Sequence, residues 1–406
     1  MTQATELLPI LDAHYRANPA YSLVLFDRLP EALQEQLKAM LEDEEFYGVI
    51  QSNNGNNPVT KAVDQETALL FLTLQDAGPI PEYVRRKFDR DCNQAIAELV
   101  LEGILEMTVN GSQEFASGGA AHSWLFREKD QSFESQNRLV QLSYNALNYG
   151  QQLPQVNASD LAMRLYRYNT IPLSPSWRDR WDNWESTAKL LRIHEIGPLS
   201  ATIERHWRSS TPADEETGWL SWHKTDQSRS PRTQTRLPYK LYISPMPAAL
   251  PDVWPVILDQ MTHSEVASFK IGNDLSGLLR PDKIVAYLPD FASVAAAAKG
   301  LQAALQDCPA QGVPFSAPID DQGLLSWGMD PNKKQSAFDS QGSESWRAWI
   351  TKQLAGALVE AREGAAGIEP RQFALDRLRL QGIDTETWVP KQSMWQNAGS
   401  FDDDNT

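Results

Sequence analysis

The sequence predicts an α+β protein with more than one domain. A chain of 406 residues is longer than one ordinary hydrophobic core supports. Its first half carries leucines at helical spacing with charges between them, whereas short strand-like runs and alanine-rich helical runs follow residue 237. We therefore expect a mostly helical N-terminal half with a winged-helix-like segment, and a C-terminal α/β domain built on a mixed sheet.

Residues 1–130 are expected to form the first domain. In residues 1–48, the stretches "TELLPILDAHYRANP" and "LPEALQEQLKAMLEDEEFYGVI" predict helices. A helix opening on a carboxylate follows in "DQETALLFLTLQDAG", and then a helical pair in "PEYVRRKFDRDCNQAIAELVLEGILEM" and a hairpin that turns at Asn110–Gly111. Helices followed by a hairpin are typical of a winged helix, which binds DNA or serves as a peptide-recognition module.

The remaining chain divides by composition. Residues 131–207 predict a helical segment that packs on the C-terminal domain, and residues 208–236, polar and poor in aliphatics, predict a flexible loop or linker. Residues 237–392 form the expected C-terminal domain. Its predicted strands are "YKLYISPMP", "EVASFKIG" and "KIVAYLPD", and its predicted helices include "FASVAAAAKGLQAALQDCP" and "SWRAWITKQLAGALVEARE". The acidic tail, residues 393–406, is expected to be disordered.

Charge and composition exclude several classes of partner. The net charge of −16 opposes general attraction to nucleic acid or to an anionic membrane surface. No run reaches the roughly 18 apolar residues of a membrane span. Cys92 and Cys308 match no metal-ligand spacing and are expected to be reduced thiols, as in a cytoplasmic protein. The chain also lacks the GxxxxGK[ST], GxGxxG, HExxH and GxSxG motifs.

Cations inside structured C-terminal sequence are the strongest chemical signal. They are Lys240, Lys270, Arg280, Lys283, Arg347, Arg377 and Arg379. The arginine fork binds phosphate bidentately, and a lysine among other cations loses proton affinity and can act as a base near neutral pH. Lys240 and Tyr242 are two residues apart on a predicted strand and therefore share a face. The set predicts a site that binds a phosphorylated substrate and can eliminate the phosphate.

Structural explanations compete with this hypothesis. Arg280 has Asp282 and Asp274 as candidate ion-pair partners. Arg377 and Arg379 have Asp376 and Asp384. A lone lysine on a strand is often an edge residue whose ammonium reaches solvent. Each cation alone is therefore ambiguous, and only their combination favours an anion site.

A family resemblance adds to this interpretation. The series "KLYISP", "FKIG", "LLRPDKIVAYL", "GVPFSAP", "GLLSWGMDP", "SWRAWI" and "FALDRLRLQGIDTETWVP" resembles the bacterial type III effector family of the Hop class. Relatives of that family accompany kinases as lyase components in lanthipeptide biosynthesis. The pattern is more distantly similar to the phosphothreonine lyases, which carry a K-x-H strand, a catalytic lysine on a later strand and phosphate-binding arginines beyond it. The closer resemblance covers roughly residues 150–390.

The resemblance implies specific roles. Lys270 would be the base that removes the α-proton of a phosphoserine or phosphothreonine residue. Lys240 and Arg280 would bind the phosphate or polarise the adjacent carbonyl. Further phosphate contacts would come from Arg347, which completes the pocket, and from Lys283, Arg377 and Arg379, with Tyr287 as a substrate-binding candidate. No metal or organic cofactor is implied.

One position departs from the family pattern. Tyr242 stands where the K-x-H strand has its histidine, which is the general acid to the leaving phosphate. A tyrosine near a cation can donate a proton, so Tyr242 remains a catalytic candidate. His223 and His263 are alternative acids.

The resemblance also implies partners and leaves alternatives open. The leading hypothesis is a lyase that acts on a phosphorylated precursor peptide, works with a separate Ser/Thr kinase and leaves room for a cyclase. A second hypothesis is a non-catalytic phosphopeptide- or leader-peptide-binding partner. A third is a secreted effector that acts on host proteins. A fourth, a winged-helix regulator, is opposed by the net charge.

Overall fold

The computed structural model divides the chain into two compact units that interleave along the sequence. Unit 1 comprises Met1–Glu134, Gly150–Ala162 and Pro331–Thr385, and unit 2 comprises Ser135–Tyr149, Met163–Asp330 and Glu386–Thr406. The boundaries predicted from composition, at residues 130, 207, 236 and 392, differ from these. The structure describes residues 2–42, 45–53, 60–87, 92–108, 114–133, 135–154, 156–181, 187–193, 197–210, 218–225, 237–331, 344–363, 368–392 and 395.

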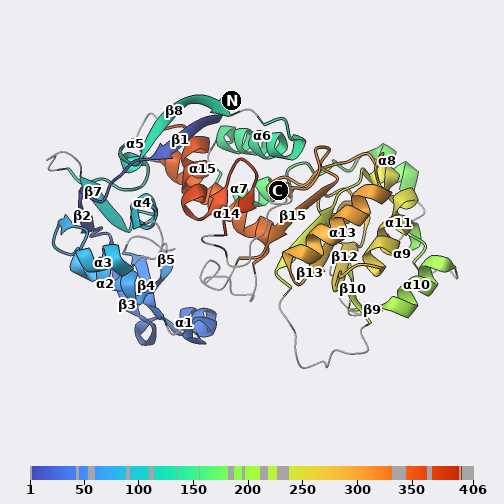
Figure 1. The fold of residues 1–406 in the computed structure, drawn as a ribbon, viewed down its shortest axis with the longest axis horizontal. Helices are drawn as coiled ribbons and strands as arrows, with labels where there is room; N and C mark the ends of the chain where they lie inside the picture. The colour runs from blue at the N-terminus through green and yellow to red at the C-terminus, as the bar shows by residue number, and fades with distance from the viewer. Residues whose placement is uncertain are drawn as a thin grey trace. The chain divides into compact units, whose positions relative to one another are not determined.

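Unit 1 combines small antiparallel sheets with helices, so the α+β class is confirmed (Figure 1). Its strands are β1 Thr2–Leu7, β2 His14–Ala17, β3 Tyr21–Leu25, β4 Phe46–Ser52, β5 Thr60–Asp64, β6 Gly78–Pro79, β7 Leu105–Thr108, β8 Phe126–Phe133 and β16 Ile383–Asp384. They pair as β1-β8, β6-β2-β7 and β3-β4-β5. Its helices are α1 Glu31–Leu37, α2 Gln65–Thr73, α3 Glu82–Lys87, α4 Cys92–Leu101, α5 His122–Leu125, α14 Trp346–Glu363 and α15 Pro370–Leu380.

The helices predicted for residues 1–48 are mostly wrong. Only α1 and the 3-10 turn Lys38–Glu42 are helical within the second stretch, and β1, β2 and β3 occupy the start of the chain. In β2, Tyr15 and Ala17 are buried while His14 is exposed. Burial of every second residue is the pattern of a strand. The nearby leucines happen to have helical spacing, which is why the sequence predicted a helix.

The middle of unit 1 follows the prediction more closely. Asp64 caps α2 by accepting a hydrogen bond from the Thr67 N–H at 2.9 Å, so this helix opens on a carboxylate as expected. The helical pair is α3 and α4. β7 continues to an antiparallel bridge between Met107 and Ala116, but the turn predicted at Asn110–Gly111 lies outside the described residues. The winged-helix comparison therefore stays a prediction.

Unit 2 is built on a seven-stranded sheet in the order β14-β15-β11-β13-β12-β10-β9. The strands are β9 Trp207–Ser209, β10 Trp219–Lys224, β11 Tyr239–Ile243, β12 Ser268–Gly272, β13 Ile284–Leu288, β14 Ala317–Pro318 and β15 Leu325–Met329. Every neighbouring pair is antiparallel, so the predicted mixed sheet is wrong. The succession β11, α11, β12 suggests a parallel pair, but β13 returns between the two strands and separates them.

Unit 2 contains one of the two helices predicted for the C-terminal domain, α13, whereas the other, α14, belongs to unit 1. The helices of unit 2 are α8 Pro175–Trp181, α9 Thr187–Leu190, α10 Pro198–His206, α11 Leu250–Thr262, α12 Leu275–Leu278 and α13 Phe291–Ala304. Two further helices, α6 Arg138–Gln152 and α7 Ala158–Tyr166, contain the points where the two units divide. β17, Val389–Pro390, also belongs to unit 2.

Part of the predicted linker, residues 208–236, is instead β10 at the side of the sheet. Within it Leu220 and Trp222 alternate with more polar residues, a strand signal that the surrounding polar sequence hides. Residues 211–217 and 226–236 lie outside the described part of the chain, as does the predicted tail except Trp395. Among the helices that the structure describes, none combines the length and apolarity needed to cross a membrane.

The two faces of the seven-stranded sheet differ in chemistry. One face carries Leu241, Phe269, Ile284 and Trp327, which pack in one core cluster with residues of α11 and α13 (Figure 1). Side chains alternate along a strand, so the intervening residues project from the other face. We call this second face the polar face. Its members on the central strands are Lys240, Tyr242, Ser268, Lys270, Val285 and Tyr287.

Candidate functional site

The register of three central strands brings four predicted site residues together on the polar face. Tyr287 of β13 lies opposite Lys240 of β11, and Val285 lies opposite both Tyr242 and Lys270. Lys240 and Tyr242 thus share a face, as predicted. The two lysines come from strands on either side of β13, and both ammonium groups lie over the Tyr287 ring, at 5.6 Å for Lys240 and 5.9 Å for Lys270.

A tight turn after β12 delivers Arg280 to the same site. Gly272 and Gly277 approach so closely that a Cβ on Gly272 would lie 2.5 Å from the Gly277 carbonyl carbon, so a larger side chain has no room there. Asp274 accepts a hydrogen bond from the Gly277 N–H at 2.7 Å and caps α12. Asp274 is therefore occupied as a cap, and Arg280 pairs with the other candidate, Asp282.

Arg280 is held in one orientation by two partners. Its Nε and Nη2 atoms donate to the two carboxylate oxygens of Asp282, each at 2.9 Å. The Tyr166 hydroxyl donates to Asp282 at 3.1 Å and accepts from Arg280 at 3.3 Å. The Arg280 side chain keeps 28% of its surface exposed, whereas Asp282 keeps 4%. One edge of the guanidinium is therefore fixed, and part of the group still faces solvent.

Lys240 is also paired. Its ammonium lies 2.7 Å from the Asp330 carboxylate, and both side chains are nearly buried. The pair compensates the lysine charge inside an environment that would otherwise penalise it.

Lys270 differs from both neighbours. Among the residues that the structure describes, no carboxylate forms an ion pair with it, and its Nζ lies 4.2 Å from the centre of the Trp219 ring. Burial and the nearby charges of Lys240 and Arg280 lower its pKa from 10.5 to about 8, against the opposing effects of Asp282 and Asp330. Lys270 is half-buried. Lys270 therefore combines partial accessibility with a lowered pKa on the polar face.

Tyr242 and Lys283 are both buried, although a general acid and a phosphate ligand were predicted to face the substrate. Tyr242 is 3% exposed and packs with Val285 and Val313. Lys283 is fully buried and donates to the Pro245 carbonyl at 2.9 Å and to Gln311 Oε1 at 2.6 Å. Burial lowers the pKa of Lys283 to about 7. The Lys283 ammonium therefore donates to acceptors inside unit 2, and its predicted phosphate contact stays a prediction.

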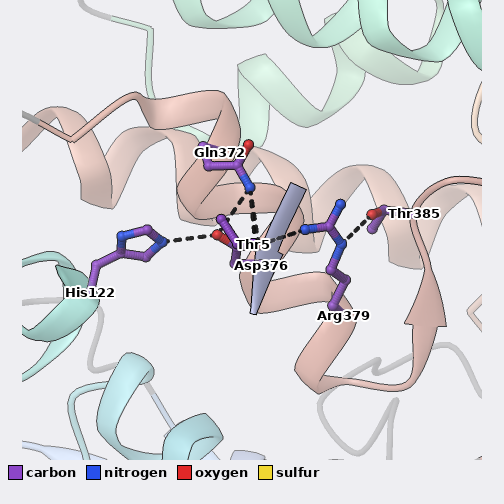
Figure 2. Close-up of polar contacts among 6 residues, drawn as sticks. All are labelled: Thr5, His122, Gln372, Asp376, Arg379 and Thr385. Atoms are coloured by element: carbon purple, nitrogen blue, oxygen red, sulfur yellow. Dashed lines mark hydrogen bonds and ion pairs between the residues drawn. The ribbon is translucent and has the colours of Figure 1, made fainter. Parts of the chain in front are cut away.

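The other three predicted arginines belong to unit 1. Arg347 lies on α14 and is 1% exposed. Arg377 pairs with Glu360 of α14. Arg379 donates to Asp376 at 2.8 Å and to the Thr385 hydroxyl at 2.7 Å, as Figure 2 shows. The structure does not place these arginines within the unit that carries Lys270.

The Asp376 carboxylate is the centre of a buried polar network in unit 1. Figure 2 shows Thr5, His122, Gln372 and Arg379 around it. His122 Nε2 lies 3.0 Å away, Gln372 Nε2 donates at 3.0 Å, and the Thr5 hydroxyl also donates. Asp376 is fully buried. This network satisfies the carboxylate internally and ties β1 to α15.

The two alternative acids are separated by the sheet. His223 of β10 is exposed and lies opposite Ser268, so it shares the polar face with Lys270. His263 ends α11, in the layer on the apolar face, with its side chain 73% exposed. Only His223 of the two is placed on the face of the proposed base. Within the described residues, no group of three or more His, Cys, Asp or Glu side chains is arranged to hold a metal ion.

Trp219, Tyr166 and Asp330 are site residues that sequence reasoning missed. Trp219 falls in the stretch assigned to a linker, and Tyr166 falls in the segment assigned to packing. The alternation in "WLSW" was the available signal, because it predicts a strand whose two tryptophans point to opposite faces. No local signal marks Asp330 as the partner of Lys240.

Comparisons with known proteins give only remote structural similarity. No protein-family model and no curated protein sequence matches the chain. An effector protein from Pseudomonas syringae pv. tomato strain DC3000 is 12% identical, with a TM-score of 0.36 over 63% of this chain and 99% of that one. The type III effector and phosphothreonine lyase OspF from Shigella flexneri is 11% identical, with a TM-score of 0.28 over 52% of this chain and 100% of that one. Similarities this weak leave the activity to be inferred from the chain's own residues.

Proposed function

We propose that this chain is a phosphoserine or phosphothreonine lyase that eliminates phosphate from a phosphorylated peptide, with Lys270 as the base. The observation that carries the proposal is the contrast on the polar face. Lys240 and Arg280 are each paired with a carboxylate, whereas Lys270 has no ion pair among the described residues and its pKa is lowered to about 8. A cation cluster that contains a deprotonatable amine suits proton abstraction next to a bound anion.

The first step is proton abstraction. The neutral amine of Lys270 takes the proton from Cα of the phosphorylated residue, and negative charge develops on the adjacent carbonyl oxygen. Arg280 and Lys240 stabilise that charge more strongly in the transition state than in the ground state. Because both cations are already fixed by Asp282 and Asp330, little reorganisation accompanies the reaction.

The second step releases phosphate. The electron pair left at Cα forms the Cα–Cβ double bond while the Cβ–O bond breaks, and inorganic phosphate leaves. Phosphoserine gives dehydroalanine and phosphothreonine gives dehydrobutyrine, and the proton on Lys270 passes to solvent. A phosphate monoanion already carries its own proton, so the burial of Tyr242 does not block the step. Should an acid be needed, His223 shares the face. This route uses no metal or organic cofactor.

The proposed setting is the modification of a precursor peptide of the lanthipeptide type. Its phosphorylated residue would come from a separate Ser/Thr kinase, because the chain carries no kinase signature. A cyclase could consume the dehydrated residue. The net charge of −16 favours a local cation site for the phosphate over general attraction to nucleic acid.

A non-catalytic phosphopeptide- or leader-peptide-binding partner is the second candidate. The departure at Tyr242, which packs in an apolar cluster with Val285 and Val313, is the specific observation that favours it. Such a protein would retain the cations that bind phosphate. Tyr242, at the position of the general acid, would serve only in core packing. A secreted effector acting on host proteins would use the same chemistry on a different peptide.

The test is mass spectrometry of a phosphothreonine peptide incubated with the wild-type chain, Lys270→Ala, Lys270→Arg and the control Lys299→Ala. Lys299 is an exposed lysine on α13, beyond the opposite face of the same sheet. We expect the wild type and the control to remove one phosphoric acid from the peptide. Both Lys270 variants should be slower by about 10²- to 10⁴-fold, because arginine keeps the charge but cannot act as a base.

Peptide binding distinguishes the two candidates. Lys270→Arg should retain phosphate-dependent binding of the peptide while it loses elimination. A wild-type chain that binds the phosphopeptide and leaves it intact would overturn the lyase and support the binding partner. A wild-type chain that neither binds nor alters phosphopeptides would contradict both.

A further inference from the structure

Trp219 lies against two like charges at once. The Lys270 ammonium is 4.2 Å from the centre of its ring, and the Arg280 guanidinium carbon is 4.9 Å from the same centre. Trp219 lies on β10 and pairs with Gly272. Gly272 is the last residue of β12, the strand that carries Lys270. Trp222, three residues later, is buried in the apolar core and stacks on Phe269. The strand therefore points one tryptophan into the core and the other at the site.

Two further aromatic rings lie against the same group of cations. Arg280 also lies over Tyr166, at 5.5 Å, and the ring of Tyr287 contacts both lysines. A ring attracts a cation through its quadrupole and leaves the charge in place. A carboxylate beside Lys270 would instead raise its pKa and compete with an incoming phosphate. An aromatic ring can therefore hold the Lys270 side chain in position and still leave its amine available to a substrate.

We propose that Trp219 is a positioning residue that holds Lys270 and Arg280 side by side, so that the amine and the guanidinium act on one substrate. The inference rests on the proposed function for its catalytic consequence. The contact itself can be tested without catalysis. The role is distinct from phosphate binding, because an indole ring offers a phosphate only one N–H.

The charged and titratable groups around Lys270 define what the test must control. They are Lys240 and Tyr242 on β11, Arg280 and Asp282 after α12, Tyr287 on β13, Asp330 after β15, His223 on β10 and, through Arg280, Tyr166 on α7. All are retained in variants of Trp219. Any change in the pH midpoint of Lys270 reactivity then reports the loss of the ring or the entry of water.

The experiment compares Trp219→Leu with Trp219→Phe by competitive labelling. A trace of acetic anhydride acetylates neutral amines, and mass spectrometry of the Lys270 peptide across a pH series gives the midpoint of its reactivity. Loss of the ring removes a stabiliser of the protonated amine, so the midpoint in Trp219→Leu should fall by about half a pH unit or more. Trp219→Phe should stay near the wild type, and the labelling of Lys299 should be the same in all three proteins.

The catalytic arm uses the plateau of the elimination rate at high pH, where Lys270 is neutral. We expect about a tenfold lower kcat for Trp219→Leu with little change in KM, and most of the rate restored by Trp219→Phe. Urea unfolding confirms that the variants are folded. A midpoint that stays or rises in Trp219→Leu, or equal behaviour of Leu and Phe, would overturn the positioning role. If the wild type shows no elimination, the lyase fails while the labelling result still decides the role of Trp219.

Discussion

The cations of α14 and α15 and the cations of the polar face look alike in the sequence but differ in their partners. In unit 1, Arg377 pairs with Glu360 and Arg379 with Asp376, so these charges are satisfied inside the unit. On the polar face, Arg280 and Lys240 are likewise paired. Lys270 alone of these five forms no ion pair among the described residues, and the contacts of its ammonium are with the rings of Trp219 and Tyr287.

Under the proposed function, this difference separates a structural cation from a reactive one. A buried ion pair holds its elements together, and breaking it leaves an uncompensated charge. A lysine that is desolvated and placed beside other cations is more easily deprotonated, because nearby positive charge disfavours its own. Removing charge should therefore cost stability in unit 1 and change chemistry in unit 2.

The largest effect on stability is expected for Asp376→Ala. The substitution removes the acceptor shared by Thr5, His122, Gln372 and Arg379. We expect the free energy of unfolding to fall by about 3 to 5 kcal/mol, since buried donors and a charge lose their partner. Urea unfolding measures this loss. Elimination per folded molecule should stay near the wild-type value.

An exposed pair in unit 1 supplies the matched control. Glu35 and Lys38 form an ion pair whose side chains are 76% and 70% exposed. Glu35→Ala should change the free energy of unfolding by less than about 1 kcal/mol. Comparable losses in Asp376→Ala and Glu35→Ala would contradict the view that the Asp376 network stabilises unit 1.

A smaller effect, on chemistry, is expected from the Lys240–Asp330 pair. Lys240→Met removes a cation that lowers the pKa of Lys270 and leaves Asp330 to raise it, so the acid limb of the pH–rate profile should move up by about one pH unit. Near neutral pH the rate would then fall about tenfold beyond any loss of phosphate binding. Asp330→Asn should move the acid limb down, because it removes the charge that raises the pKa of Lys270 and leaves Lys240 to lower it.

The profile of elimination rate against pH from about 6 to 10 measures both shifts. The directions matter more than the rates, since either variant can also weaken substrate binding. Shifts in the same direction for the two variants would show that the pair does not set the pKa of Lys270 through its charges.

The sequence predicted which side chains share a face of the central strands, but it did not predict the ion-pair partners of those side chains. Alternation in "KLYIS", "SFKIG" and "IVAYL" was sufficient to place Lys240 and Tyr242 on one face, because a strand has a fixed period of two. It could not reveal that Lys240 meets Asp330, since that pair depends on how β15 lies beside β11. The start of the chain was mispredicted because its short strands are stabilised by distant partners, as β1 is by β8.

A last effect concerns Lys283, a cation in unit 2 that donates to neutral acceptors and is buried. Its pKa is about 7 in the folded chain and near 10.5 when exposed. Between these values the unfolded chain holds a proton that the folded chain has released, so unfolding becomes less favourable as the pH rises. The free energy of unfolding should therefore increase from about pH 7 to pH 10, by at most about 1.4 kcal/mol per pH unit from this group.

Lys283→Met isolates this contribution, because it removes the titrating amine and keeps an apolar side chain of similar length. The variant leaves Gln311 Oε1 without the Lys283 donor, which lowers stability by about 1 to 3 kcal/mol at every pH. The informative quantity is therefore the slope of the unfolding free energy against pH, measured in urea for both proteins. A shallower slope in Lys283→Met identifies Lys283 as a buried neutral amine. Equal slopes would mean that Lys283 stays protonated in the folded chain, and Lys270 would then be the more easily deprotonated of the two lysines.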